Sequence, residues 1–299
     1  MNVLEVYMPR DYVLMTDSDS DLPWRYAKER GIPVVRMPYS VGDQEYYDDN
    51  GESGREKDFF DHMRKGSAAS TSLLPTAAYL EYFDPILAKS DLLFIAFSSK
   101  MSATFQNVLE AREELLQKYP GRRFTVVDTL SISFPMTLLV MRAYELYDAG
   151  ASMDEVEKWL LENRTRSQVY LTVDDLVYLR RGGRISSTSA VVGSMLNIKP
   201  ILTLTRAGKL EAFGKVQGQK KAMKAIVDQA ALNIEDAAGQ QVLIFHADCG
   251  DSAELLRQML SQRLPEIREI SVHMIGPVIG AHAGPGTLGL CFMGRERPL

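Results

Sequence analysis

The chain has 299 residues, 45% of them hydrophobic and 24% charged, a balance typical of water-soluble globular proteins. A formal net charge of −5 argues against nucleic acid as a partner, because proteins that bind nucleic acid usually carry a basic face. The two cysteines are too few for a disulfide scaffold, no signal peptide is evident, and no apolar run approaches the roughly 18 residues that span a membrane, so we expect a cytoplasmic protein.

Short apolar runs alternate with helical patterns, which predicts parallel sheets covered by helices. In the first half, strands are expected at residues 12–16, 33–37, 92–97 and 124–127. Helices are expected at about 77–88, 103–118 and 152–163, the second of which places Phe105, Val108 and Leu115 on one face.

The second half is predicted to be a mixed sheet. Its strands are expected at residues 169–173, 201–204, 242–246, 271–275 and 288–292, with a helix at about 219–232. Residues 201–204 and 210–213 flank an Ala-Gly turn, which indicates a β-hairpin and therefore an antiparallel element. We expect two α/β domains, residues 1–166 with a mainly parallel sheet and residues 167–299 with a mixed sheet.

Two loops rich in hydroxyl groups precede helices in the first half: residues 70–76, which include Thr71 and Ser72, and residues 97–104, which include Ser98, Ser99 and Ser102. Hydroxyls and free N–H groups at a helix N-terminus, beside the carboxyl end of a strand, can bind an anion. Helix capping explains either loop equally well. Two such loops in one α/β domain favour an anion site at a shared sheet edge.

Three further segments have unusual composition. Residues 16–23, Thr-Asp-Ser-Asp-Ser-Asp-Leu-Pro, are interpreted as the N-cap of a helix starting near Pro23, with a role in fixing the other loops as the alternative. In residues 178–186, Gly182 and Gly183 are expected to end a helix and to turn Arg184 towards solvent. The Gly-x-Gly-x-x-Gly at 284–289 is rejected as a dinucleotide motif, because only ten residues follow it.

Catalytic and metal sites are not supported by the motifs. The sequence contains no Gly-x-Ser-x-Gly elbow, no phosphate-binding Walker loop and no His-Glu-x-x-His pair. His246, Asp248, His273 and His282 match no standard metal-ligand spacing. We therefore expect neither an enzyme nor a metal or cofactor site.

Six motifs in this order resemble the DegV family, over about residues 13–292. They are Thr16-Asp17-Ser18 with Leu22-Pro23, Thr71-Ser72, the loop from Ser98 to Thr104, Val127-Asp128-Thr129, Gly182-Gly183-Arg184-Ile185, and His282 with Gly284-Pro285-Gly286. The chain departs from the common pattern at Leu73-Leu74, in place of Gln-Pro, and at Ala103, in place of Gly. Neither change removes a hydroxyl, but both affect the expected shape of the site entrance.

The resemblance implies a carrier that holds one long-chain fatty acid between its domains and presents the carboxylate to a fatty acid kinase. It further implies that Thr71, Ser99 and His282 bind the carboxylate, with Ser72, Ser98 and Ser102 in the same loops. Arg184 and Arg181 would meet the acyl phosphate or the kinase. Transient membrane contact stays open.

Two other classes of function also stay open. One is a module of the same fold that binds a small molecule other than a lipid, since a fold does not determine function. The other is an enzyme acting on a phosphorylated small molecule in the hydroxyl-rich cleft.

Overall fold

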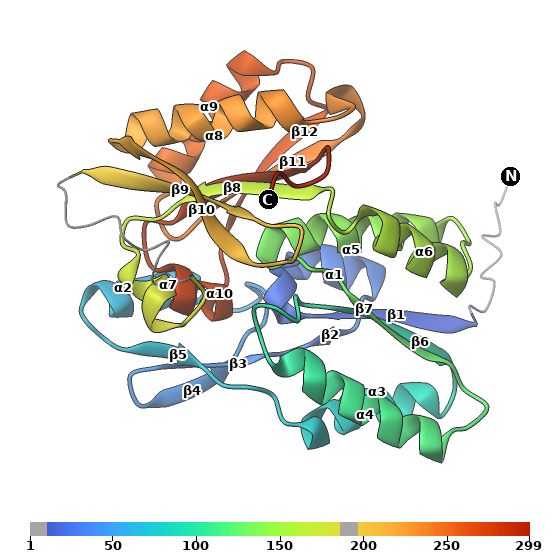
Figure 1. Cartoon of the computed structure of the whole chain (residues 1–299). Helices are drawn as coiled ribbons and strands as arrows, with labels where there is room; N and C mark the ends of the chain where they lie inside the picture. Colours follow the sequence, from blue (N-terminus) through green and yellow to red (C-terminus); the bar gives the residue numbers. More distant parts are fainter. Residues whose placement is uncertain (1–10, 186–196) are drawn as a thin grey trace, which may run out of the picture.

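The first half of the chain is built on a parallel sheet of four strands. The computed structural model describes residues 11–185 and 197–299. The sheet has the order β2-β1-β6-β7, and its strands are β1 (Tyr12–Asp17), β2 (Val34–Val35), β6 (Asp91–Ala96) and β7 (Phe124–Asp128). The prediction of a parallel sheet in this half is therefore confirmed, and Figure 1 shows helices on both of its faces.

Alternation along the strands explains the two layers of helices. In β6, Leu92 and Phe94 pack into one hydrophobic cluster, whereas Leu93 and Ile95 pack into another on the opposite face. The first cluster lies under α3 (Thr76–Leu87) and α4 (Thr104–Lys118). The second lies under α5 (Ser133–Asp148) and α6 (Met153–Asn163), while α1 (Trp24–Arg30) follows β1.

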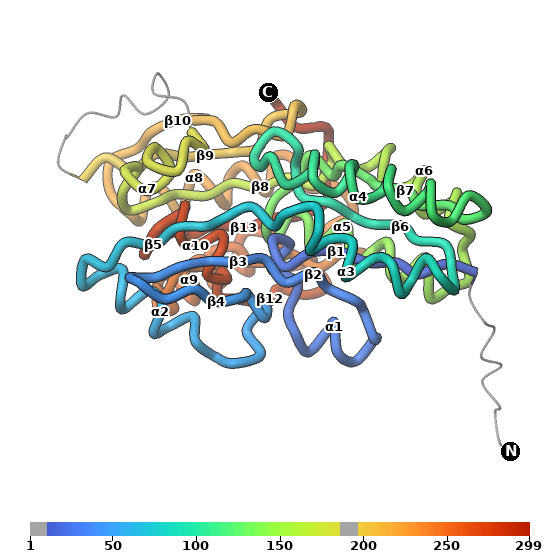
Figure 2. The backbone as a smooth tube through the Cα atoms, turned by 90° about the horizontal axis from the view of Figure 1, so that it is seen from below, coloured from blue at the N-terminus to red at the C-terminus, as the bar shows by residue number. Residues whose placement is uncertain are grey.

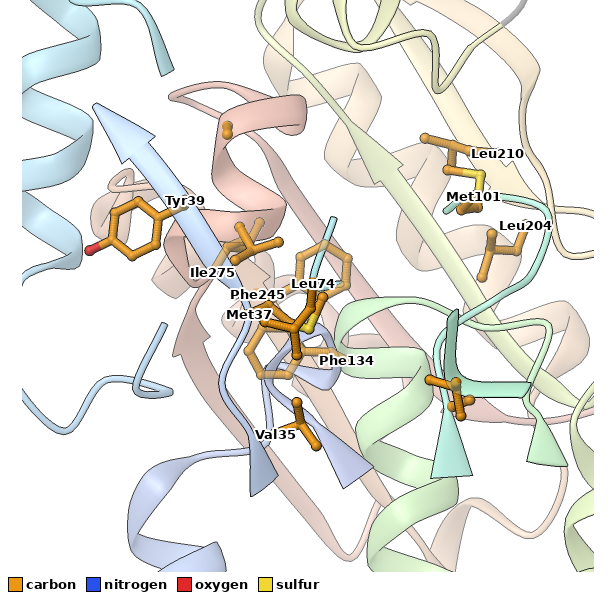
Figure 3. Close-up of a cluster of buried hydrophobic side chains, with 14 of the residues drawn as sticks. Val35, Met37, Tyr39, Leu74, Met101, Phe134, Leu204, Leu210, Phe245 and Ile275 are labelled. Atoms are coloured by element: carbon orange, nitrogen blue, oxygen red, sulfur yellow. The ribbon is translucent and has the colours of Figure 1, made fainter. Parts of the chain in front are cut away.

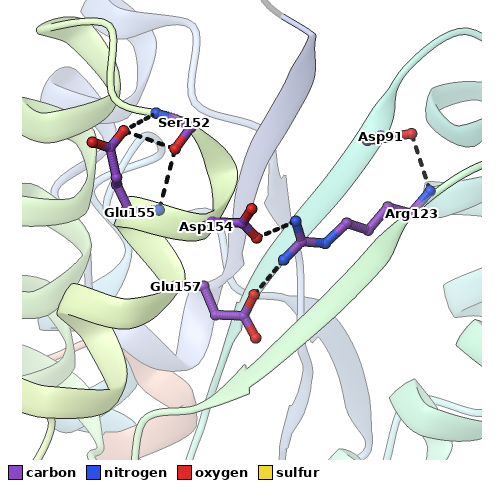
Figure 4. A network of polar contacts seen from close by, with 6 residues as sticks. All are labelled: Asp91, Arg123, Ser152, Asp154, Glu155 and Glu157. Atoms are coloured by element: carbon purple, nitrogen blue, oxygen red, sulfur yellow. Dashed lines mark hydrogen bonds and ion pairs between the residues drawn. The ribbon is translucent and has the colours of Figure 1, made fainter.

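Helix α6 begins with a capping box, in which Ser152 Oγ accepts from Glu155 N and Glu155 Oε2 accepts from Ser152 N. Figure 4 shows this box beside Arg123, whose guanidinium pairs with Asp154 and Glu157. The amide of Arg123 donates to Asp91 Oδ1 over 3.0 Å. These contacts join α6 to the edge of the parallel sheet.

The second half forms a mixed sheet of six strands in the order β10-β9-β8-β13-β11-β12, as expected. Among its described strands, β11 and β12 pair in parallel and the other neighbours pair antiparallel. Its strands are β8 (Ser167–Thr172), β9 (Ile198–Leu204), β10 (Leu210–Gln217), β11 (Gln241–His246), β12 (Glu269–Met274) and β13 (Leu288–Met293). Helices α8 (Gln219–Asn233) and α9 (Gly250–Arg263) cover its outer face, with a short 3-10 turn, η2 (Ala237–Gly239), between them.

The sequence analysis did not predict a third, antiparallel sheet. It contains β3 (Pro38–Val41), β4 (Gln44–Tyr47) and β5 (Ala69–Thr71), in the order β4-β3-β5. Helix α2 (Glu56–Arg64) packs on β3, and α10 (Pro277–Ala283), which also contacts α7 (Val177–Arg181), crosses β3 and β5. In Figure 2 this small sheet lies beside α10, so it joins the first half of the chain to the last helix.

The two large sheets enclose a shared core. Helix α5 packs against β1 on one side and against β8 and β13 on the other, and ten of its residues are buried. Side chains from both halves meet in this core, and Figure 3 shows Val35, Met37 and Leu74 beside Phe245 and Ile275. A cavity lies in this region.

Candidate functional site

The cavity lies between the inner face of the six-stranded sheet and the loops that follow β1, β6 and β7. The space between atoms in the cavity and its mouth is about 770 Å³. Most of its wall is apolar, with Phe97, Met101, Leu171, Phe245 and Ile275 among the lining side chains.

Polar residues form a smaller part of the wall, and two of them contact each other. The hydroxyl of Thr71 lies 2.8 Å from His282 Nε2. Asp19, Ser102, Ser133, Arg184 and Thr287 also line the cavity. The arrangement is therefore a mainly apolar space with a group of hydrogen-bonding side chains in its wall.

The small antiparallel sheet and α10 position the Thr71–His282 pair. Thr71 ends β5, where it pairs with Tyr39 of β3, and α10 packs across β5. His282 lies in the last turn of α10. On its other side, a Cβ at Gly182 would lie only 2.3 Å from His282 Nδ1, so the ring needs a glycine at that position.

His282 is neutral at pH 7. Burial, together with the positive charges of Arg184 and Arg181, lowers the pKa of its imidazole to about 4. A neutral imidazole has one N–H donor and one acceptor nitrogen. His282 Nδ1 lies against Gly182, so the pair offers a donor to a ligand oxygen when Nε2–H donates to Thr71 Oγ1 and leaves the Thr71 hydroxyl proton free.

Arg184 corrects an expectation. We expected its guanidinium to face solvent, but the residue is half-buried and lines the cavity. Gly183 has φ +69°, and the amide of Arg184 bonds back to the Leu179 carbonyl over 2.9 Å, as in a Schellman motif. This reversal lets Arg184 Nε donate to the Met101 carbonyl over 3.0 Å, while another guanidinium nitrogen bonds the Gly182 carbonyl.

The other predicted site residues take different positions. Ser102 lines the cavity, and Ser98 is buried with its hydroxyl donating to the Gly208 carbonyl over 2.8 Å. Ser99 is half-buried and its amide donates to Asp128 Oδ1; within the described chain it is not part of the cavity wall. Ser72 and Arg181 are exposed, and Ser186 lies outside the described residues.

The interpretation of residues 16–23 as an N-cap is wrong. The N-cap of α1 is Pro23, and no side-chain cap bond is present among the described residues at α1 or at η1 (Ser18–Ser20). The acidic side chains of this segment are buried instead. Burial raises the pKa of Asp17 to about 7 and raises that of Asp21 well above its usual range.

These buried acids hold the loops of the site together. Asp17 accepts from the amide of Phe97, and Asp21 accepts from the hydroxyl of Ser133 and, over 2.9 Å, from the amide of Gly276. Asp48 accepts from the amide of Val278 over 3.4 Å, and burial raises the pKa of Asp48 to about 7. Asp21 and Asp48 therefore secure the start of α10, the helix that carries His282.

The structure gives no basis for a metal or a membrane span in its described part. Residues 11–185 and 197–299 contain no group of three or more His, Cys, Asp or Glu side chains placed to hold a metal ion. No helix in these ranges is both long enough and apolar enough to cross a bilayer.

Comparison with known proteins gives concordant matches over nearly the whole chain. The family model described as "uncharacterised protein, DegV family" matches residues 12–295. A DegV domain-containing protein of Clostridium perfringens is 37% identical over 96% of this chain and 99% of its own length.

Solved structures share the fold. A DegV family protein of Thermus thermophilus, whose structure is described as showing fatty acid binding, is 32% identical with a TM-score of 0.84, over 95% of this chain and 100% of its own. A Bacillus subtilis protein described as a fatty acid-binding DegV is 25% identical with a TM-score of 0.80, over 96% and 100%.

Proposed function

The chain belongs to the DegV family, and from this premise we propose that its cavity holds one long-chain fatty acid. The carboxylate lies at Thr71 and His282, near Arg184, and the tail follows the apolar wall past Leu171 and Phe245. The observation that carries this proposal is the Thr71–His282 hydrogen bond in the wall of a mainly apolar cavity between the two large sheets. Two relatives described as binding fatty acids support it.

The tail and the head group contribute differently to affinity. A sixteen-carbon tail has about fourteen methylenes, which at ~0.8 kcal/mol each give at most ~11 kcal/mol of transfer free energy. A hydrogen bond to a charged group adds only about 1.5–3 kcal/mol. The tail therefore supplies most of the affinity, and the polar residues set the orientation of the ligand and keep its buried carboxylate paired.

Two side chains favour a carboxylate at the Thr71 end. The hydroxyl of Thr71 can donate to the carboxylate when His282 Nε2 donates to Thr71, and the guanidinium of Arg184 supplies a positive charge without a carboxylate bonded to it in the described chain. Ser102 adds a hydroxyl, and the proposed contact of Ser99 with the head group requires its hydroxyl to turn inward.

We further propose that the bound acid is presented to a fatty acid kinase, and that this takes place in the cytoplasm. Arg181 is exposed at the end of α7, three residues before Arg184, and its guanidinium lies over the ring of Tyr178. An arginine suits bidentate contact with a phosphate or with an acidic partner. In this account the chain performs no chemistry itself, and acyl phosphate forms only when the kinase and ATP are added.

Lipid analysis of the purified protein tests the binding proposal. We expect about one equivalent of a long-chain fatty acid to be extracted from protein purified without detergent, and delipidated protein to take up an added fatty acid. An absence of both bound and added fatty acid would refute the proposal. Binding of a non-acidic small molecule in its place would identify a module of the same fold with another ligand.

A further inference from the structure

Asp19 is a buried carboxylate in the wall of the same cavity. It is 4% exposed, and its Oδ1 atom has no hydrogen-bond partner within residues 11–185 and 197–299. Asp21 and Asp48, by contrast, each accept a backbone N–H at the start of α10. A buried acceptor without a partner is rare in a native protein and costs free energy unless something else pairs with it.

Several charged or titratable groups act on Asp19. Those from the neighbouring segments are Asp17 of β1, Asp21 of the following loop, Asp48 of the β4–α2 loop, Tyr79 of α3 and Arg184 after α7. Only Arg184 in this set is positive, and it also acts on His282, which is neutral. Burial and the three acids raise the pKa of Asp19 well above its usual range, while Arg184 lowers it.

A fatty acid in this cavity would bring a second carboxyl group close to Asp19. An ionised Asp19 and a fatty acid carboxylate would put two negative charges beside one guanidinium in a space from which water is largely excluded. Two carboxylates that share such a site do not both ionise, because the like charges repel and neither is well solvated. A proton between them removes the repulsion and supplies the missing hydrogen-bond donor.

We propose that Asp19 is part of the head-group site and is protonated when the fatty acid is bound, so that its O–H donates to the ligand's carboxylate. The proton comes from solvent or is already on Asp19 in the empty protein. This inference rests on the proposed function, because it requires the carboxylate to enter this cavity. It makes the protein selective for acids under conditions in which Asp19 can hold a proton.

We expect the affinity for a fatty acid to depend on pH through the titration of Asp19. Acid affinity is highest where Asp19 of the empty protein is already protonated, and above that pKa it falls about ten-fold per pH unit, because binding then requires the uptake of a proton. Affinity for an alcohol of the same chain length has no such requirement. Replacing Asp19 with Asn keeps a donor and an acceptor in place and removes the titration.

The test measures the affinities of lauric acid and dodecanol for the wild type, Asp19→Asn and Asp17→Asn between about pH 6 and pH 9. Asp17→Asn is the comparison variant, because it removes a neighbouring buried acid that is not in the described cavity wall; since Asp17 raises the pKa of Asp19, the pH dependence should persist in this variant and begin at a lower pH. We expect the ratio of acid to alcohol affinity to fall with rising pH in the wild type and in Asp17→Asn, by about ten-fold per pH unit above the pKa of Asp19, and to stay constant in Asp19→Asn. Calorimetry in buffers of different ionisation enthalpy should detect proton uptake that Asp19→Asn lacks.

Retained dodecanol binding shows that the Asp19→Asn variant is folded, and Asp19→Ser replaces it if binding is lost. Equal pH profiles for the wild type and the Asp19 variant, with acid still bound, would overturn this inference and leave the proposed function standing. Failure of the wild type to bind both lauric acid and palmitic acid at any pH would instead overturn the proposed function.

Discussion

Arg297 and Asp19 are both buried charged residues between the two large sheets, but their surroundings differ. Arg297 is fully buried, and its guanidinium donates to the carbonyls of Ser167, Leu130 and Thr205 and to the hydroxyl of Ser131. Asp19 keeps an oxygen without a partner in the described chain, in the wall of a cavity. A buried ionisable group whose polar atoms all have hydrogen-bond partners holds the fold together, whereas one with an unpaired atom beside an open space is available to a ligand.

The largest effect on stability is expected when the buried Arg297 is replaced. Arg297→Met should remove donors from four acceptors in β8, in the β7–α5 loop and in the β9–β10 hairpin. We expect the free energy of unfolding to fall by about 3 kcal/mol, and the thermal midpoint by roughly 6–12 °C. Calorimetry and denaturant unfolding measure both quantities.

Arg295→Met is the control for this variant, because Arg295 is exposed in the same segment. It should leave stability within about 0.5 kcal/mol. An Arg297→Met protein as stable as the wild type would show that the hydrogen bonds of Arg297 are dispensable, and would contradict the stabilising role assigned to this residue.

Replacing a polar residue in the cavity wall is expected to change the affinity for a fatty acid. Thr71→Val keeps the shape of the side chain and removes the hydroxyl that contacts His282. Fatty acid affinity should fall about ten- to a hundred-fold, as expected for a hydrogen bond to a charged group, while binding of the methyl ester changes little. A fluorescent displacement titration measures both ligands.

Variants of two nearby serines show whether the loss of affinity is specific to Thr71. Ser72→Ala, at an exposed position, should leave both affinities unchanged. Ser99→Ala decides whether that hydroxyl turns inward on binding, and a loss restricted to the acid would place it in the head-group site. Equal losses for acid and ester in Thr71→Val would mean that Thr71 serves only the packing of β5.

The buried acids also make stability depend on pH. The folded pKa of Asp17 is raised to about 7 from 3.8, so the folded state binds the proton more tightly. The stability from this group is present below pH 3.8 and is lost as the pH rises through about 7. Asp17→Asn should therefore stabilise the protein by roughly 1–2 kcal/mol at pH 8 and flatten the decline between pH 5 and 8.

Denaturant unfolding across this pH range measures the effect, with Asp43→Asn, at an exposed turn, as the control. The lowered pKa of His282 acts with the opposite sign, since its stabilisation is complete above pH 6.5 and is lost as the pH falls towards 4. A wild-type stability that rises from pH 5 to 8 and an Asn variant that is no more stable would contradict the role assigned to Asp17.

The smallest effect is expected at Arg123, an arginine that contrasts with Arg297. Its ion pairs with Asp154 and Glu157 lie at the surface (Figure 4), where solvent screens them. Arg123→Met should cost less than about 1 kcal/mol, and added salt should reduce that cost. A loss as large as that of Arg297→Met would show that burial does not separate the two arginines.

The sequence was most informative where a strand is long and apolar. Strands β1, β6 and β7 and the β9–β10 hairpin were placed within a few residues, because each has an uninterrupted apolar run or a clear turn. Strands β3 and β5 have four and three residues, too few to display an alternating pattern. Helix α5 is buried on nearly all sides between two sheets, so it has no amphipathic pattern to recognise.

Some features of the site could be predicted from the sequence and others could not. Thr71, Ser102, Arg184 and His282 were found through the family motifs, and the structure places all four at the cavity. Which of these residues contact each other could not be predicted from their spacing in the sequence, because Thr71 and His282 form a hydrogen bond although they are 211 residues apart. Asp19 was interpreted as part of an N-cap, although three acids at alternate positions after a strand exceed what one helix start can use.

A crystal structure of the protein with palmitate tests the central claim most directly. The account predicts one ligand in the cavity between the two sheets, with a carboxylate oxygen within hydrogen-bonding distance of Thr71 Oγ1 or His282 Nε2 and the tail against Leu171 and Phe245. A carboxylate located away from Thr71 and His282, or a cavity that stays empty at saturating palmitate, would contradict it.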